Sequence, residues 1–150
     1  MPKVSRKRVI AAPLDAVWDL VSDPHSLPRW WPKTTRVEDV RQSADGAGAE
    51  WTSVLGTERG TAVRADYRCT TKESNRAYAW AQQLEGSPFE RVLKAAEVAV
   101  ALTPQGSGTE VTITASETLR GLSRLGSPMM RGAAGGRLDD ALDGIERALT

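Results

Sequence analysis

The feature that most constrains the fold is the C-terminal stretch from about Leu122 to Leu149, where apolar residues recur three or four positions apart. This spacing places them on one side of an α-helix. They are Leu122, Leu125, Met129, Ala133, Leu138, Ala141, Leu142, Ile145, Ala148 and Leu149. The opposite side of the second half carries Asp139, Asp140, Asp143, Glu146 and Arg147, which indicates an ordinary solvated face. A continuous helix of this length measures about 42 Å at ~1.5 Å per residue, enough to cross a small sheet.

The first half of this helix is unusual because it is rich in glycine. The glycines are Gly126, Gly132, Gly135 and Gly136. Each interior glycine costs roughly 1 kcal/mol of helix stability. Two interpretations are open. The helix begins near Pro128 as its first residue and has a loose first turn, or the segment lies over a cavity, where glycines permit close approach or movement.

The middle of the chain, from Val37 to Thr118, alternates apolar and polar residues as half-buried strands do. In the clearest run, one parity holds Val63, Ala65, Tyr67 and Cys69, and the other holds Arg64, Asp66 and Arg68. The remaining inward sets are Trp51, Ser53 and Leu55; Tyr78, Trp80, Gln82 and Leu84; Ala96, Val98, Val100 and Leu102; and Val111, Ile113 and Ala115. The segments SADGAG, GTERG, KESNR, EGSP and PQGSGT supply tight turns, so the sequence predicts an antiparallel meander.

The beginning of the chain combines a strand with short helices. Residues 3–11 read as a first strand, after which Pro13 opens a short helix with its apolar face turned inward. That face holds Leu14, Val17, Trp18 and Val21. Asp23-Pro24 ends the helix. The following segment, PHSLPRWWP, has too many prolines for a long helix, and its tryptophans are too apolar for a free loop. We therefore expect a short helical turn whose tryptophans dock on the body of the protein.

Segregated helices and an antiparallel sheet define the α+β class. We expect a curved sheet of seven strands, two short helices between strands 1 and 2, and a long C-terminal helix that covers the concave face. The 150 residues suit one domain, because a chain of this length buries about two thirds of the surface that its unfolded form exposes.

The opening IAAPLDAVWDLVSDPHSLPRWWP resembles that of the SRPBCC superfamily, which includes the START, birch-pollen-allergen and polyketide cyclase/dehydrase proteins. The matching residues are Ala12-Pro13, Asp15, Val17-Trp18, Asp23 and Trp31-Pro32. A second match is GSGTEVTI, where Gly108-Thr109 precedes alternating apolar residues. The resemblance covers residues 1–150 as one START-like domain and implies the helix-grip fold. It implies little about activity, because the superfamily shares a scaffold and a cavity rather than a catalytic signature.

Charge and cysteine content exclude several classes of function. The chain has 20 Lys plus Arg against 19 Asp plus Glu, which argues against a nucleic-acid binder. The basic cluster at Lys3, Arg6, Lys7 and Arg8 is typical of a protected sheet edge. The single Cys69 excludes an internal disulfide and fits a reducing compartment. No stretch approaches the ~18 apolar residues of a membrane span, and no signal sequence is visible, so we expect a soluble cytoplasmic protein.

The usual catalytic and cofactor motifs do not occur in this sequence. The lone His25 lies in the proline-rich segment, where a surface or capping role is expected, and no serine or cysteine nucleophile has a matching base. The sequence contains neither GxGxxG nor a P-loop, and it has no metal-ligand pair at helical spacing. GAAGG is rejected as a phosphate loop because no strand precedes it. We therefore expect no cofactor and no metal.

The remaining candidates for function are the aromatic side chains of the inward parity. Two interpretations are open: the rings fill the core, or they line a ligand pocket, as the resemblance implies. A bulky, partly oxygenated ligand would suit rings with a polar tip. The expected pocket residues are Trp30, Trp51, Ser53, Tyr67, Tyr78, Trp80, Gln82, Val98, Val100, Ile113, Met129 and Met130. Arg91 is a further polar candidate.

The leading hypothesis is a carrier or sensor that binds a small hydrophobic molecule such as a lipid, an isoprenoid or a polyketide, as a monomer or weak homodimer. The alternative is an enzyme like the polyketide aromatase/cyclases, which needs an acid or base inside the pocket. We expect no inward carboxylate or histidine, which weakens the alternative. A module that binds another protein through the sheet exterior is disfavoured, because the outward strand faces carry Thr, Arg and Ala instead of an apolar patch.

Overall fold

The computed structural model describes residues 3–42, 48–56, 60, 62–87, 89–90, 93–119 and 127–150, without the side chains of residues 119 and 127–134. The strands are β1 (Lys3–Ile10), β2 (Thr34–Gln42), β3 (Ala49–Gly56), β4 (Ala62–Glu73), β5 (Ala77–Gln83), β6 (Leu93–Gln105) and β7 (Gly108–Leu119). The helices are α1 (Leu14–Val21), the short 3-10 helix η1 (Pro24–Ser26), α2 (Leu27–Trp30) and α3 (Ser127–Leu149). The expected α+β class, with a seven-stranded antiparallel sheet and a C-terminal helix, is confirmed.

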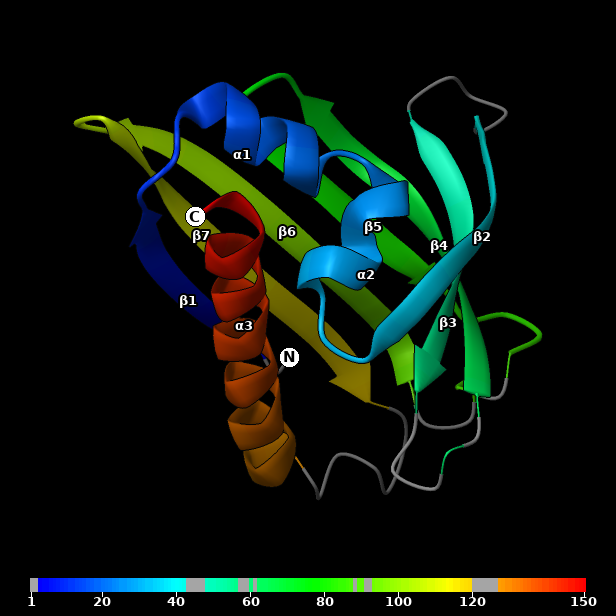
Figure 1. Ribbon diagram of the computed structural model, residues 1–150. Coiled ribbons are helices and arrows are strands. Elements are labelled where there is room, and N and C mark those ends of the chain that lie inside the picture. The colour runs from blue at the N-terminus through cyan, green and yellow to red at the C-terminus, as the bar shows by residue number, and fades with distance from the viewer. Residues whose placement is uncertain are drawn as a thin grey trace.

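The strand order explains where the short helices lie. The sheet runs β1-β7-β6-β5-β4-β3-β2, so β1 and β2 occupy opposite edges although only residues 11–33 separate them in sequence. The connecting segment must therefore cross the sheet, and α1 and α2 lie in front of the strands in Figure 1. The helices thus share the concave face. The short helices α1 and α2 lie over its middle, and α3 lies along the β1 and β7 side.

The expected apolar face of α3 is confirmed in its second half. Leu138, Ala141, Leu142 and Ile145 are at most 1% exposed, and α3 packs against β1, β7, α1 and α2. Gly144 permits the contact with α2, because a Cβ at this position would overlap the backbone of Trp30. Residues 120–126 lie outside the description, so the expected start near Leu122 stays a prediction.

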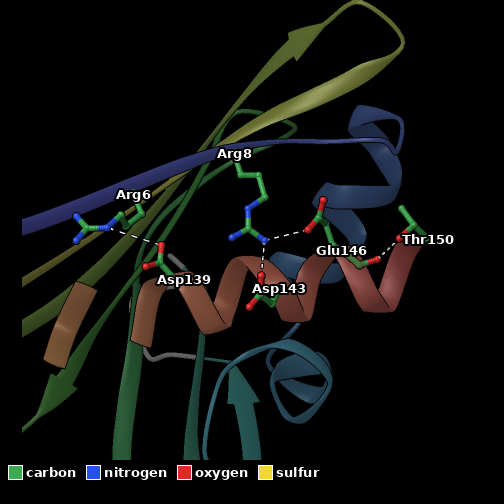
Figure 2. Close-up of polar contacts among 6 residues, drawn as sticks. All are labelled: Arg6, Arg8, Asp139, Asp143, Glu146 and Thr150. Atoms are coloured by element: carbon green, nitrogen blue, oxygen red, sulfur yellow. Dashed lines mark hydrogen bonds and ion pairs between the residues drawn. The ribbon is translucent and has the colours of Figure 1, made fainter. Parts of the chain in front are cut away.

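The charged side of α3 is largely solvated, as expected, because Asp139, Asp140, Asp143 and Arg147 are exposed, but it also forms ion pairs with β1. The guanidinium of Arg8 lies 2.6 Å from Asp143 Oδ1 and 2.9 Å from Glu146 Oε1, and Arg6 Nε lies 3.7 Å from Asp139 Oδ1 (Figure 2). The hydrogen bond with Asp143 is the main cause that raises the pKa of Arg8 above its ordinary value. The basic residues of the edge strand therefore also tie β1 to α3.

The first helices lie where the sequence predicted them, between Pro13 and Trp31. Pro13 precedes α1, and Trp18 packs edge to face with Tyr78 at 6.2 Å. The Asp23 carboxylate accepts a hydrogen bond of 3.0 Å from the backbone N–H of His25, which starts η1 and turns the chain. Trp30 then docks on the body with 2% exposure.

The side chains that strand alternation assigned to the convex face point to solvent. Arg64, Asp66 and Arg68 are exposed. On this face Arg64 forms an ion pair with Glu38 at 3.0 Å, and Asp66 accepts a hydrogen bond of 2.6 Å from Thr52. Within the described residues, no helix has both the length and the apolar character that a membrane span requires.

Candidate functional site

An aromatic cluster occupies the concave face around Trp80 of β5. The rings of Trp30, Trp31, Trp51 and Tyr78 lie 5.4–6.2 Å from the Trp80 ring, centroid to centroid. Strand register assembles it, because Trp51 pairs with Tyr67 and Cys69 pairs with Trp80 across adjacent strands. Trp51 and Tyr67 are stacked at 5.9 Å. The ring partners of Trp80 come from α2, the residue that follows it and the strands, while α3, which has no aromatic residue, approaches Trp80 through Arg137 across a shared cavity.

Half of the twelve expected pocket residues pack as core side chains. Six of them are 3% exposed or less and do not line the cavity that Trp80 borders: Trp30, Trp51, Ser53, Tyr78, Val100 and Ile113. The interpretation that aromatic rings fill the core therefore describes this part of the cluster. Met129 and Met130 belong to α3, but their side chains lie outside the description, as does Arg91.

One small cavity remains open beside the cluster, with a volume of about 60 Å³. Its lining residues are Trp31, Tyr67, Trp80, Gln82, Ala96, Glu97, Val98, Ala115, Glu117 and Arg137. Four of these were expected from the sequence: Tyr67, Trp80, Gln82 and Val98. Trp31 lines the cavity in place of its buried neighbour Trp30. Whether any of these residues contacts a ligand stays a prediction.

The cavity contains an ion pair that sequence reasoning missed. Arg137 Nη2 of α3 donates a hydrogen bond of 3.0 Å to Glu117 Oε1 of β7. The expectation that no carboxylate faces inward is wrong, because Glu117 continues the inward parity of Ile113 and Ala115 by one step. Arg137 gave no signal of its own, since it sits at the border between the apolar and charged sides of the helix.

The pair leaves hydrogen-bonding capacity inside the cavity. The side chains of Glu117 and Arg137 are 19% and 39% exposed, so both are partly withdrawn from water. Arg137 Nε is buried and has no acceptor among the described residues, and the same holds for Trp51 Nε1, which lies outside the cavity lining. Buried donors of this kind are rare in folded proteins, because each unmade bond costs about 1–3 kcal/mol. A carbonyl or hydroxyl oxygen would satisfy such a donor.

Tyr67 contributes a neutral hydroxyl to the same wall. Burial raises the pKa of Tyr67 to about 12, with Arg137 opposing this shift and Glu117 adding to it. At neutral pH its hydroxyl can therefore donate or accept a hydrogen bond but does not act as an anion. Together with the Gln82 amide, it gives the cavity uncharged polar groups beside the ion pair.

The remaining reactive side chains lie elsewhere. The His25 ring is 67% exposed and its Nδ1 lies 3.2 Å from the Asp23 carboxylate, in agreement with the expected surface position. Cys69 is buried, and burial raises the pKa of its thiol, which opposes a role as a nucleophile. Within the described part of the chain, no three His, Cys, Asp or Glu side chains gather as metal ligands would.

Comparisons with known proteins give a consistent picture of the fold. The family described as polyketide cyclase / dehydrase and lipid transport matches residues 1–150. Among curated proteins, none matches the chain. A START superfamily protein from Mycobacterium smegmatis is 17% identical with a TM-score of 0.79, over 98% of this chain and 96% of that chain.

Two aromatase/cyclase structures share the fold as well. The Zhui aromatase/cyclase from Streptomyces sp. R1128 is 16% identical with a TM-score of 0.77, over 98% of this chain and 92% of that chain. The di-domain ARO/CYC StfQ of the steffimycin biosynthetic pathway is 13% identical with a TM-score of 0.79, over 99% of this chain and 50% of that chain. At these identities the similarity establishes a START-like fold, as expected from the sequence.

Proposed function

Because this chain belongs to the polyketide cyclase / dehydrase and lipid transport family, we propose that it binds a small, mainly apolar molecule on the concave face of its sheet, as a carrier or sensor. The proposed ligand is a lipid, an isoprenoid or a polyketide-like compound with at least one carbonyl or hydroxyl oxygen. The observation that carries the proposal is the cavity whose aromatic walls surround the Glu117–Arg137 pair.

The composition of the walls supports this ligand class. Trp31 and Trp80 offer large apolar surfaces at little cost in conformational entropy. Arg137 Nε offers a donor that no described residue uses. A ligand oxygen that reaches the Arg137 guanidinium would gain a charge-assisted hydrogen bond, typically worth 1.5–3 kcal/mol, whereas a pure hydrocarbon would gain none.

The second candidate is an enzyme that closes rings by aldol addition, and one observation favours it. Glu117 supplies a carboxylate inside the cavity, next to a guanidinium. In this reaction Glu117 would remove a proton from the carbon beside a ketone, and the N–H groups of Arg137 would stabilise the enolate oxygen. Glu117→Gln should then abolish turnover of a poly-ketone chain while ligand binding persists. Turnover that survives this substitution would exclude Glu117 as the base.

Binding can be tested by calorimetric titration with 2-nonanone, a neutral probe with one carbonyl and an apolar chain. Trp80→Ala should weaken binding by about tenfold or more, because the substitution removes a cavity wall. Trp31→Ala provides a second variant at a half-buried position that is less important for stability. His25→Ala is the control and should bind as the wild type does. If His25→Ala abolished binding while both tryptophan variants kept it, the proposed site would be in the wrong part of the molecule.

A further inference from the structure

The sheet is split between β5 and β6. Their described pairing runs from Ala77 with Ala101 to Ala81 with Glu97 and goes no further. On either side the sheet continues, since β4–β5 pairing reaches Gln83 and β6–β7 pairing reaches Leu93. A register shift between Leu93 and Ala95 marks a β-bulge, a feature that bends a strand away from its neighbour.

A groove lies beside this split. The groove has a volume of about 520 Å³ and is lined by Ala81, Gln82, Gln83, Leu84, Glu85, Glu90, Lys94, Ala95, Ala96, Glu97 and Ser116. Gln82, Ala96 and Glu97 line both this groove and the inner cavity. The two spaces therefore share three wall residues, at the place where no described ladder joins the strands.

The volumes differ in a way that matters for a ligand. Sites for small molecules usually measure about 300–1,000 Å³. The inner cavity, at about 60 Å³, has room for only one end of such a molecule. The groove, at about 520 Å³, has room for the rest. Its lining is mostly polar, but Ala81, Leu84, Ala95 and Ala96 are apolar side chains that an alkyl chain can contact.

We propose that the split between β5 and β6 is the mouth of the binding site. An elongated ligand keeps its oxygen-bearing head beside Arg137 and Gln82, and its unbranched apolar chain passes through the split into the groove. This inference rests on the proposed function and adds to it the shape of the ligand and its route of entry. The ligand class is thus a chain with a carbonyl or hydroxyl group near one end.

A series of 2-alkanones from 2-pentanone to 2-decanone tests the proposal by calorimetry. In the wild type, affinity should rise about three- to fourfold with each added methylene, because each one is buried. Ala95→Trp fills the groove from an exposed position and should remove this gain while leaving the affinity for 2-pentanone unchanged. Ala101→Trp is the matched control, since Ala101 is exposed on the same strand but lines neither space.

A second measurement needs no substitution near the site. In the wild type, 2-decanone should shift the methyl NMR signals of Leu84 and Ala95, whereas 2-pentanone should leave them in place and Ala101 should respond to neither. The proposal would be overturned if the affinity of Ala95→Trp rose with chain length as the wild type's does, and if 2-decanone left the methyl signals of Leu84 and Ala95 in the wild type unchanged. The proposed function would still stand in that case. If no ketone bound the wild type, the proposed function would fail together with this inference.

Discussion

At the scale of single residues, burial controls the charge of the cavity wall. The ordinary pKa of a tyrosine is 10.0, and burial raises that of Tyr67 to about 12. Burial also raises the pKa of Tyr78, which is the other tyrosine of the chain. The folded protein therefore holds both phenols in their neutral form at a pH where the unfolded chain would ionise them.

This difference predicts alkaline destabilisation with a defined direction. A folded pKa above the unfolded one means that the stabilising contribution of Tyr67 is complete below pH 10.0 and is lost as pH rises toward about 12. The free energy of unfolding, measured in urea between pH 9 and 11.5, should fall across this range. Tyr67→Phe should show a smaller fall. An unchanged slope in Tyr67→Phe would mean that Tyr67 is not buried as described.

Single residues also show where sequence reasoning reached its limit. Extending the strand parity by one step would have found Glu117, so that residue was predictable. Arg137 was not, because the helical period leaves residues at the border of the apolar face undecided. The extent to which tryptophan rings fill the concave space depends on their rotamers and on α2, and no pattern in the sequence reports either.

At the scale of elements, α3 is held at two different surfaces. Its apolar face packs on the core, while its charged side pairs with β1 through Arg6 and Arg8. Leu142→Ala and Ile145→Ala should each reduce the free energy of unfolding by roughly 2–4 kcal/mol, because both side chains are at most 1% exposed. Chemical denaturation measures this loss. Losses below 1 kcal/mol at both positions would show that the second half of α3 is loosely packed.

The glycines of α3 offer a matched pair of substitutions. At Gly144 a new methyl group would collide with the Trp30 backbone, so Gly144→Ala should destabilise by about 1–3 kcal/mol and shift α2. At Gly136 a new Cβ would meet no described atom within 4 Å beyond its own helix backbone and chain neighbours, so Gly136→Ala should be neutral or stabilising by up to about 1 kcal/mol. Thermal melts of both variants measure the difference in stability. Equal changes in melting temperature would contradict the close contact between α2 and α3.

Element types were predictable because periodicity is strong in the strands and in the second half of α3. Which element covers which part of the concave face was not predictable. The sequence assigned the whole concave face to the long helix, whereas α1 and α2 cover its middle. The split between β5 and β6 also lacked a signal, because a bulge near Leu93 and Ala95 changes the course of a strand without changing its composition.

At the scale of the whole molecule, strand order and function are connected. Since β1 and β2 lie at opposite edges, the chain must cross the concave face, and this crossing brings Trp31 to the cavity. The neighbouring positions of β1 and β7 bring α3 over β7, where Arg137 meets Glu117. The cavity is therefore assembled from both ends and the middle of the chain, and its polar pair depends on the docking of α3.

The most direct measurement of the central claim is the affinity of 2-nonanone for Arg137→Met, with Arg147→Met on the same helix as the control. Methionine preserves apolar volume and removes the guanidinium donors. We expect Arg137→Met to weaken binding by about tenfold or more, as loss of a hydrogen bond to a charged group does, while its melting temperature shows that the fold persists. Arg147→Met should bind as the wild type does. Equal affinities for Arg137→Met and the wild type would contradict the account, because the ligand oxygen would then lie away from the Glu117–Arg137 pair.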